Sequence, residues 1–246
     1  MPAQTGDGMS AGRSVFLSLR AMLVPIRPEG FPFVAAVLFA ALFLGWFWQP
    51  VLWIGLILAG WCTYFFRDPK RYTPIDKDLV VSPADGRVAK VSLSVAPKEL
   101  GLGEQTRRRV SIFMNVFDCH VNRTPVSGRI ARIVYTPGKF FNAELDKASE
   151  ANERNGFIID TERGPIGMVQ IAGLIARRIV TFRKEGEELL AGDRVGLIRF
   201  GSRVDLYLPV SATILVAEGQ RAVAGETAVA HFEDKGVGGE RRVRVS

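Results

Sequence analysis

Cysteine and histidine are both scarce in this chain of 246 residues, which has two of each. Two cysteines cannot build the disulfide framework of a small secreted domain, and they favour a reducing compartment. With so few sulfur and imidazole ligands, we expect neither a metal site nor a dissociable cofactor. Any acid–base chemistry that needs an imidazole must use His120 or His231.

Charged residues are missing from one long segment, Phe31–Phe66. As a single helix this segment would extend about 54 Å, against a hydrocarbon core of ~30 Å. A break is expected at Gly45–Pro50, because proline disfavours continuing the helix and tryptophans suit a membrane interface. The sequence therefore predicts a transmembrane or re-entrant helical hairpin over residues 31–66, after a polar segment over residues 1–30 in which Leu17–Ile26 could form an amphipathic helix. A soluble core hairpin would need a larger domain to cover it than the rest of the chain provides.

Acidic residues are fewer than basic ones, so that the formal net charge is +7. The basic residues are scattered and form no helix-length stripe, which argues against nucleic acid and favours an anionic membrane surface as the partner. Arg27 flanks one end of the apolar segment, and Arg67, Lys70 and Arg71 flank the other. The positive-inside rule then places both ends, and the domain that follows, on the cytoplasmic side of the cell (inner) membrane.

Residues 67–246 are predicted to be mainly β. Short alternating apolar runs separated by Gly and Pro indicate an antiparallel β-sandwich, or a domain like a barrel-sandwich hybrid. Lys139–Asn155 is the main helical candidate. The runs expected to be strands are Leu79–Val81, Arg87–Ser92, Arg109–Val116, Gly128–Tyr135, Gly156–Asp160, Ile166–Ile171, Ile179–Phe182, Arg194–Ile198, Val204–Leu208 and Thr213–Val216.

An internal repeat lies in this region. Glu185–Asp193 recurs as Glu218–Glu226, 33 residues later, and each copy reads as two turns that lead into a strand. The pattern resembles the repeated hairpins of biotinyl and lipoyl carrier domains, and it predicts a pseudo-symmetric β domain. The carrier function itself is not supported, because no lysine stands at the tip of a hairpin.

Gly201 and Ser202 interrupt two apolar runs that alternate like strands. A glycine in such a place usually marks a bulge, a bend or a close backbone approach. The alternative is a self-cleavage site, at which the Ser202 hydroxyl attacks the carbonyl of Gly201. The residues alone leave both interpretations open.

Three motifs and one longer segment decide between them. Taken in order, they resemble the motifs of phosphatidylserine decarboxylases, most closely those of the short-form, bacterial-type branch, and the resemblance covers roughly residues 65–232. The stretches that carry it are Val81–Val88, Asp118–Pro125, Gly138–Asn155 and Phe200–Ser202.

This resemblance implies a membrane-attached enzyme of phospholipid biosynthesis that converts phosphatidylserine to phosphatidylethanolamine. It also implies self-cleavage between Gly201 and Ser202, which leaves a large chain (1–201) and a small chain (202–246) interleaved in one domain. Ser202 would become a covalent pyruvoyl group, whose carbonyl can form a Schiff base with the substrate amine and act as an electron sink.

The family uses an aspartate, a histidine and the serine in processing, and the matching residues here are Asp85, His120 and Ser202. Long-form relatives have two histidines three residues apart, whereas this chain has Arg123 at the second position. Either His120 serves both processing and decarboxylation, or Asp85 acts with another group. Residues expected to contact the substrate head group are Arg123, Asn122, Lys139, Asn142 and Arg154, with Asn152 and Asn155 as weaker candidates.

Two other functions fit part of this pattern. A decarboxylase of a related serine-headed ether phospholipid would use the same residues, so the sequence discriminates poorly against it. A non-catalytic, membrane-anchored β module would share the apolar hairpin and the strands, but its chain would stay intact.

Overall fold

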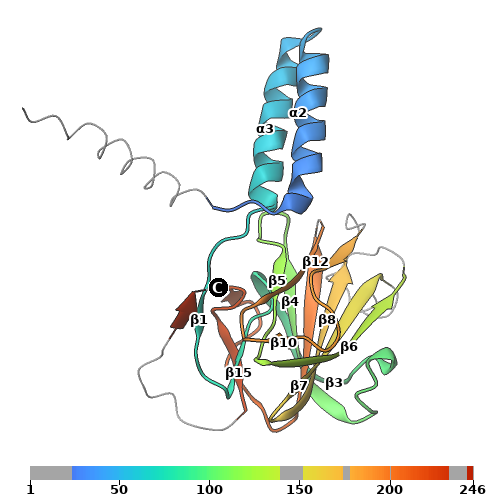
Figure 1. Cartoon of the computed structure of the whole chain (residues 1–246), viewed down its shortest axis with the longest axis vertical. Helices are drawn as coiled ribbons and strands as arrows, with labels where there is room; N and C mark the ends of the chain where they lie inside the picture. Colours follow the sequence, from blue (N-terminus) through green and yellow to red (C-terminus); the bar gives the residue numbers. More distant parts are fainter. Residues whose placement is uncertain (1–23, 139–151, 174–177, 200, 233–242, 246) are drawn as a thin grey trace, which may run out of the picture. The chain divides into compact units, whose positions relative to one another are not determined.

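The chain divides into two compact units, Met1–Pro69 and Lys70–Ser246, which are described separately. The computed structural model describes residues 24–138, 152–173, 178–199, 201–232 and 243–245. In the first unit, a short 3-10 helix η1 (Pro28–Gly30) leads into α2 (Phe31–Gly45), and α3 (Gln49–Phe65) returns beside it (Figure 1). The predicted hairpin and its break are thus confirmed.

The two helices approach each other closely because small residues lie between them. A Cβ atom at Gly55 would stand 2.2 Å from the Cβ of Ala41, and one at Gly45 would stand 2.6 Å from the Cβ of Leu52. By length and composition, Pro28–Gly45 could cross a membrane, whereas Gln49–Phe65 is a shorter apolar helix. Of the expected amphipathic helix, residues 17–23 lie outside the described residues, and residues 24–26 are not helical.

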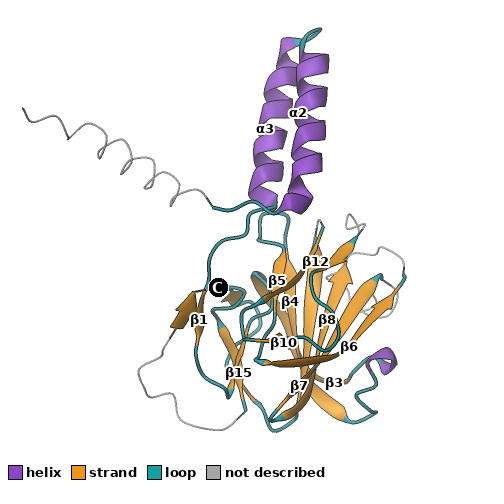
Figure 2. Ribbon diagram, viewed as in Figure 1, coloured by secondary structure: helices purple, strands orange, loops and turns teal. Residues whose placement is uncertain are grey.

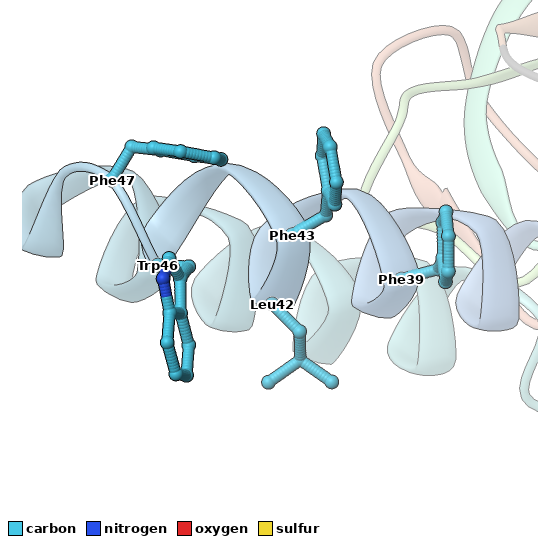
Figure 3. Close-up of a pocket in the computed structure, with 5 residues that line it drawn as sticks. All are labelled: Phe39, Leu42, Phe43, Trp46 and Phe47. Atoms are coloured by element: carbon cyan, nitrogen blue, oxygen red, sulfur yellow. The ribbon is translucent and has the colours of Figure 1, made fainter.

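Aromatic side chains follow one another along α2 and into the turn after it. Phe39, Phe43 and Phe47 are each more than half exposed, and their ring centroids are 6.3 and 5.9 Å apart in succession. Figure 3 shows them projecting from the helix together with Leu42 and Trp46. Large apolar side chains therefore face outward on this helix instead of forming a protein core.

The second unit is mainly β, as predicted, and its principal sheet is an antiparallel, curled half-barrel (Figure 2). This sheet has the order β10-β6-β7-β8-β12-β4-β3-β14, and two three-stranded sheets have the orders β5-β11-β9 and β13-β15-β2. A 3-10 helix η2 (Lys98–Leu100) lies between β3 and β4. The strands are β1 (Tyr72–Pro74), β2 (Leu79–Val81), β3 (Gly86–Val95), β4 (Thr106–Met114), β5 (Val121–Arg123), β6 (Gly128–Thr136), β7 (Arg154–Thr161), β8 (Gly164–Ala172), β9 (Ile179–Thr181), β10 (Glu188–Leu189), β11 (Arg194–Ile198), β12 (Ser202–Leu208), β13 (Thr213–Ile214), β14 (Arg221–Ala222), β15 (Ala228–His231) and β16 (Val243–Val245), which pairs with β1.

The expected helix over Lys139–Asn155 is not confirmed where the structure describes it. Residues 139–151 lie outside the described residues, and Arg154 and Asn155 begin strand β7. Hydrogen bonding across the sheet explains the difference, because Asn155 pairs with Tyr135 on one side and with Gln170 on the other.

The predicted repeat is present, and it extends further than the sequence showed. Strands β9, β10 and β11 recur in the same order as β13, β14 and β15. The turn after β2, Ser82-Pro-Ala-Asp-Gly-Arg-Val88, recurs after β5 as Thr124-Pro-Val-Ser-Gly-Arg-Ile130. In both turns the first hydroxyl donates to the backbone carbonyl two residues later, at 2.7 and 2.8 Å.

The order of the principal sheet reads symmetrically from its centre, where β8 lies beside β12. We call β2–β4 with β12–β15 the outer repeat, and β5–β11 the inserted repeat, because the second is contained within the first. Met168 of β8 and Leu206 of β12 face each other at the central pair and are fully buried in the main core. Each strand of one repeat therefore has a counterpart in the other.

Two glycines begin equivalent strands, Gly86 in β3 and Gly128 in β6. Their φ angles are +150° and +158°, and a Cβ atom would stand 2.1 Å from the carbonyl oxygen of Phe113 and 2.2 Å from that of Asp160. Because each neighbour is backbone of the adjacent strand, it cannot move aside without breaking sheet pairing.

We expect Gly86→Ala and Gly128→Ala each to lower the free energy of unfolding by about 3 kcal/mol, since both combine strain with a backbone clash. Gly103→Ala is the matched control, because Gly103 has φ +78° but open space around it. It should cost only about 1 kcal/mol. Thermal unfolding of the detergent-solubilised protein measures all three. Equal losses would show that the close approach contributes nothing.

Candidate active site

Ser202 is the first residue of β12, the strand at the centre of the principal sheet. It lies opposite Met114 of β4 and Ala172 of β8, and it is fully buried. Alternation along the strand puts its side chain on the same face as Val204, which belongs to the main core. Gly201 precedes it with φ +66°, in the left-handed region that favours glycine.

His120 precedes β5 and reaches the residue before Ser202. Its Nδ1 lies 3.0 Å from the backbone oxygen of Asp118, and its Nε2 lies 3.3 Å from the backbone nitrogen of Gly201. Since a carbonyl can only accept, we assign the proton to Nδ1, so that Nε2 accepts from the Gly201 N–H. The structure thus brings His120 and Gly201–Ser202 together, with an unprotonated ring nitrogen at the predicted cleavage site.

The Asp118 carboxylate holds the loop that carries His120. It accepts a hydrogen bond of 2.8 Å from the backbone N–H of Asn115, and it is paired with Arg221 of β14. Asp118 is 1% exposed. Its place in the Asp-Cys-His motif was visible in the sequence, but its role in fixing the loop was not.

Asp85 lies in the turn between β2 and β3. Its carboxylate oxygens are 2.7 and 2.9 Å from the guanidinium of Arg71, and one of them accepts the backbone N–H of Ala224 at 2.8 Å. Among the residues that the structure describes, Asp85 is hydrogen-bonded to neither His120 nor Ser202. The three members of the predicted triad are therefore not joined by hydrogen bonds in this structure.

The equivalent turn of the inserted repeat explains part of this arrangement. There, Ser127 occupies the place of Asp85, and its hydroxyl accepts the backbone N–H of Ala191 at 2.9 Å. In both repeats, therefore, the side chain at this position closes the turn by accepting a backbone N–H. A carboxylate in place of the hydroxyl adds a charge in the outer repeat, which Arg71 neutralises.

Three side-chain amides form a buried row that ends near Ser202. Asn155 Nδ2 donates to Gln170 Oε1 at 3.2 Å, and Gln170 Nε2 donates to Asn122 Oδ1 at 2.7 Å. Asn122 Nδ2 is 3.5 Å from Met114 Sδ. Sequence reasoning missed Gln170 and Met114, although a glutamine at an inward position of the apolar run Ile166–Ile171 was a usable signal.

Two of the cations predicted to bind substrate already have partners in the protein. The Arg123 guanidinium is 1% exposed and donates to the carbonyl of Gly192 at 2.8 Å. Arg154 is paired with Glu99. Lys139 and Asn142, also predicted to contact substrate, lie outside the described residues, and Asn152 donates to the carbonyl of Ala172 at 2.7 Å.

Comparison with known families identifies the family of this chain. A sequence model described as phosphatidylserine decarboxylase matches residues 58–230. The chain belongs to the phosphatidylserine decarboxylase family. It is therefore an enzyme that decarboxylates phosphatidylserine. The matched region runs from within α3 to β15, and it contains His120, Gly201 and Ser202 in the geometry described above.

In this decarboxylase, the ion pair between Arg71 and Asp85 is nearly buried, with side chains only 11% and 13% exposed. Removing the cation leaves a poorly solvated carboxylate without compensation. We expect Arg71→Met to lower the free energy of unfolding by about 3 kcal/mol. Lys77→Met is the control, because its pair with Glu162 is 3.9 Å long and exposed. That change should cost less than about 0.5 kcal/mol in the same thermal or urea unfolding measurement.

Proposed function

We propose that Ser202 is converted by self-cleavage to a covalent pyruvoyl group, and that this group serves the conversion of phosphatidylserine to phosphatidylethanolamine in phospholipid biosynthesis. The observation that carries the proposal is the bond between His120 Nε2 and the Gly201 N–H, directly before a buried serine. A neutral imidazole at that place can accept and return protons where peptide cleavage requires them.

Cleavage and formation of the pyruvoyl group take three steps that involve only this chain and water. First, Ser202 Oγ attacks the carbonyl carbon of Gly201, the bond from that carbon to the nitrogen of Ser202 breaks, and the hydroxyl proton passes to the released amine. Next, a base takes the Cα proton of residue 202, the electron pair left behind forms a Cα–Cβ double bond, and the Cβ–Oγ bond breaks, which releases Gly201 as a carboxylate. The resulting dehydroalanine takes up water and loses ammonia, which leaves the pyruvoyl group at the new N-terminus.

The residues present fit such a group. A Cβ atom at Gly201 would meet nothing within 4 Å, so there is free space beside the bond that is to be cleaved. Ser202 lies at the end of a strand that remains paired on both sides along its length. The small chain 202–246 would therefore stay in place between β4 and β8 of the large chain 1–201.

Once formed, a pyruvoyl group supplies an electrophilic carbonyl that condenses with an amine and withdraws electrons from a neighbouring bond. The side chains around residue 202 would bind the head group and exclude water. His120 Nε2, which is unprotonated in this structure, would have to take up a proton before it could deliver one to the substrate carbon that has lost carbon dioxide. Contacts to the head group are assigned to Arg123, Asn122, Lys139, Asn142 and Arg154. Arg123 and Arg154 would have to contact the head group while they also stay bonded to their present partners, the carbonyl of Gly192 and the carboxylate of Glu99.

The hairpin α2–α3 would hold the enzyme at its lipid substrate. Its helices, of 15 and 17 residues, rise about 23 and 26 Å, which is slightly less than a hydrocarbon core of ~30 Å. Charged residues flank only the open end of the hairpin, which favours the cytoplasmic side of the cell membrane for both ends. The positive net charge would attract an anionic membrane surface.

Intact-mass measurement of the detergent-solubilised enzyme tests the cleavage. We expect two chains split between residues 201 and 202, the smaller one lighter by one ammonia than a chain that begins with serine. Ser202→Ala should give one uncut chain, and His120→Ala should slow cleavage by about 10²–10⁴-fold. His231→Ala is the control and should cut at the normal rate, since His231 lies near Asp76. A wild-type chain that is active but uncut would contradict the proposal, and an inactive, uncut chain would favour the β module.

Membrane attachment has a separate test. Phe43→Arg combined with Ile57→Arg places two charges on exposed faces of the hairpin, at a cost of about 3 kcal/mol each in hydrocarbon. We expect this variant to be released when membranes are washed with urea, whereas the wild type stays bound. Leu93→Arg with Val95→Arg, on exposed positions of β3, is the control and should stay bound. Equal retention of both variants would contradict insertion of the hairpin.

A further inference from the structure

The buried row of amides reaches Ser202 through a methionine sulfur. We call Asn155, Gln170 and Asn122 the amide chain; its last member donates to Met114 Sδ at 3.5 Å. The Ser202 hydroxyl lies 3.9 Å from the same sulfur and donates to it. Two donors thus converge on one thioether, with the predicted nucleophile on one side and the amide chain on the other.

Placing amides here is costly for the fold unless every polar group is bonded. Gln170 and Asn122 are fully buried, and Asn155 is 2% exposed. The backbone of β11 makes room for them, because a Cβ atom at Gly196 would stand 3.1 Å from Gln170 Nε2. The site therefore contains a row of three amide side chains among apolar ones, and the backbone of β11 packs closely against this row.

The outer repeat shows what the fold needs at the same positions. Gln170 is the seventh residue of β8, and its equivalent in β12 is Leu208. Asn122 is the middle residue of β5, and its equivalent in β2 is Val80. Leu208 and Val80 are both fully buried in the main core. The outer repeat thus has apolar side chains at these two positions, so the fold does not require amides there.

We infer that the amide chain and Met114 position the Ser202 hydroxyl for self-cleavage, an inference that rests on the proposed function. Asn122 fixes the Met114 side chain, whose sulfur then selects one orientation of the Ser202 side chain among its staggered rotamers. A thioether accepts only weakly. It therefore orients the hydroxyl without holding its proton tightly, and a lone pair of Oγ remains available for the carbonyl carbon of Gly201.

The repeat suggests the variant that tests this inference. Asn122→Val combined with Gln170→Leu gives the inserted repeat the two side chains that the outer repeat already packs, and Asn155 keeps its bond of 3.2 Å to Thr181. The full chain is translated in a cell-free system with lipid vesicles, and the two fragments are followed by pulse-chase electrophoresis. We expect cleavage to slow about tenfold, which is about 1.4 kcal/mol on the barrier, with little change in Tm.

Met114→Leu and Met168→Leu form a matched pair that does not depend on how well the double variant folds. Both methionines are fully buried in the main core, but Met114 accepts the hydrogen bond of Ser202, whereas Met168 lies opposite Leu206. Cleavage should slow about tenfold in Met114→Leu and stay normal in Met168→Leu. Gln170→Glu should recover most of the wild-type rate at acidic pH, where a neutral carboxyl can still donate to Asn122, and lose it as the carboxyl ionises.

The outcomes separate the inference from the proposed function. If the wild type cuts between residues 201 and 202 while Met114→Leu and the double variant cut at the same rate, the positioning role is overturned and the proposed function stands. If Met168→Leu slows as much as Met114→Leu, packing alone explains the effect and the inference also fails. If the wild type never cuts, the proposed function itself fails.

Discussion

Pairing of β12 with β4 on one side and β8 on the other is the interaction on which the rest of the domain depends. This strand joins two halves that are far apart in the sequence, and it places Ser202 at the end of the central strand pair. Its inward side chains at positions 204, 206 and 208 are fully buried in the main core. The proposed nucleophile thus begins a strand that pairs with a neighbour on each side.

The duplicated architecture also contains two equivalent junctions between the repeats, and these junctions carry different residues. Asp78 precedes β2 as His120 precedes β5, and Arg163 precedes β8 as Gly201 precedes β12. Asp78 and Arg163 form a hydrogen-bonded ion pair of 2.9 Å, whereas His120 meets the backbone of Gly201. Of these two equivalent junctions, one is thus held by an ordinary ion pair, and the other places a histidine at the predicted cleavage site.

Sequence patterns predicted the long strands, the hairpin and the family motifs, because alternation, apolar length and motif spacing are local properties. They missed short strands such as β5, which has three residues and is held by pairing with β11. They identified Asp85 but could not supply its partner Arg71, since that contact depends on where the linker is placed. Gln170 was visible as a polar residue in an apolar run, but its link to Asn122 required the sheet register. The roles of the individual site residues remain predictions.

Cleavage at the start of the central strand would have a consequence for the lifetime of the folded enzyme. The small chain would hold β12 to β16, which pair with β4, β8, β3, β2 and β1 of the large chain. Neither chain could then complete the principal sheet alone, so refolding would become a bimolecular reaction that depends on concentration. The folded enzyme would then last because its unfolding is slow, since chains that have separated would rarely meet again.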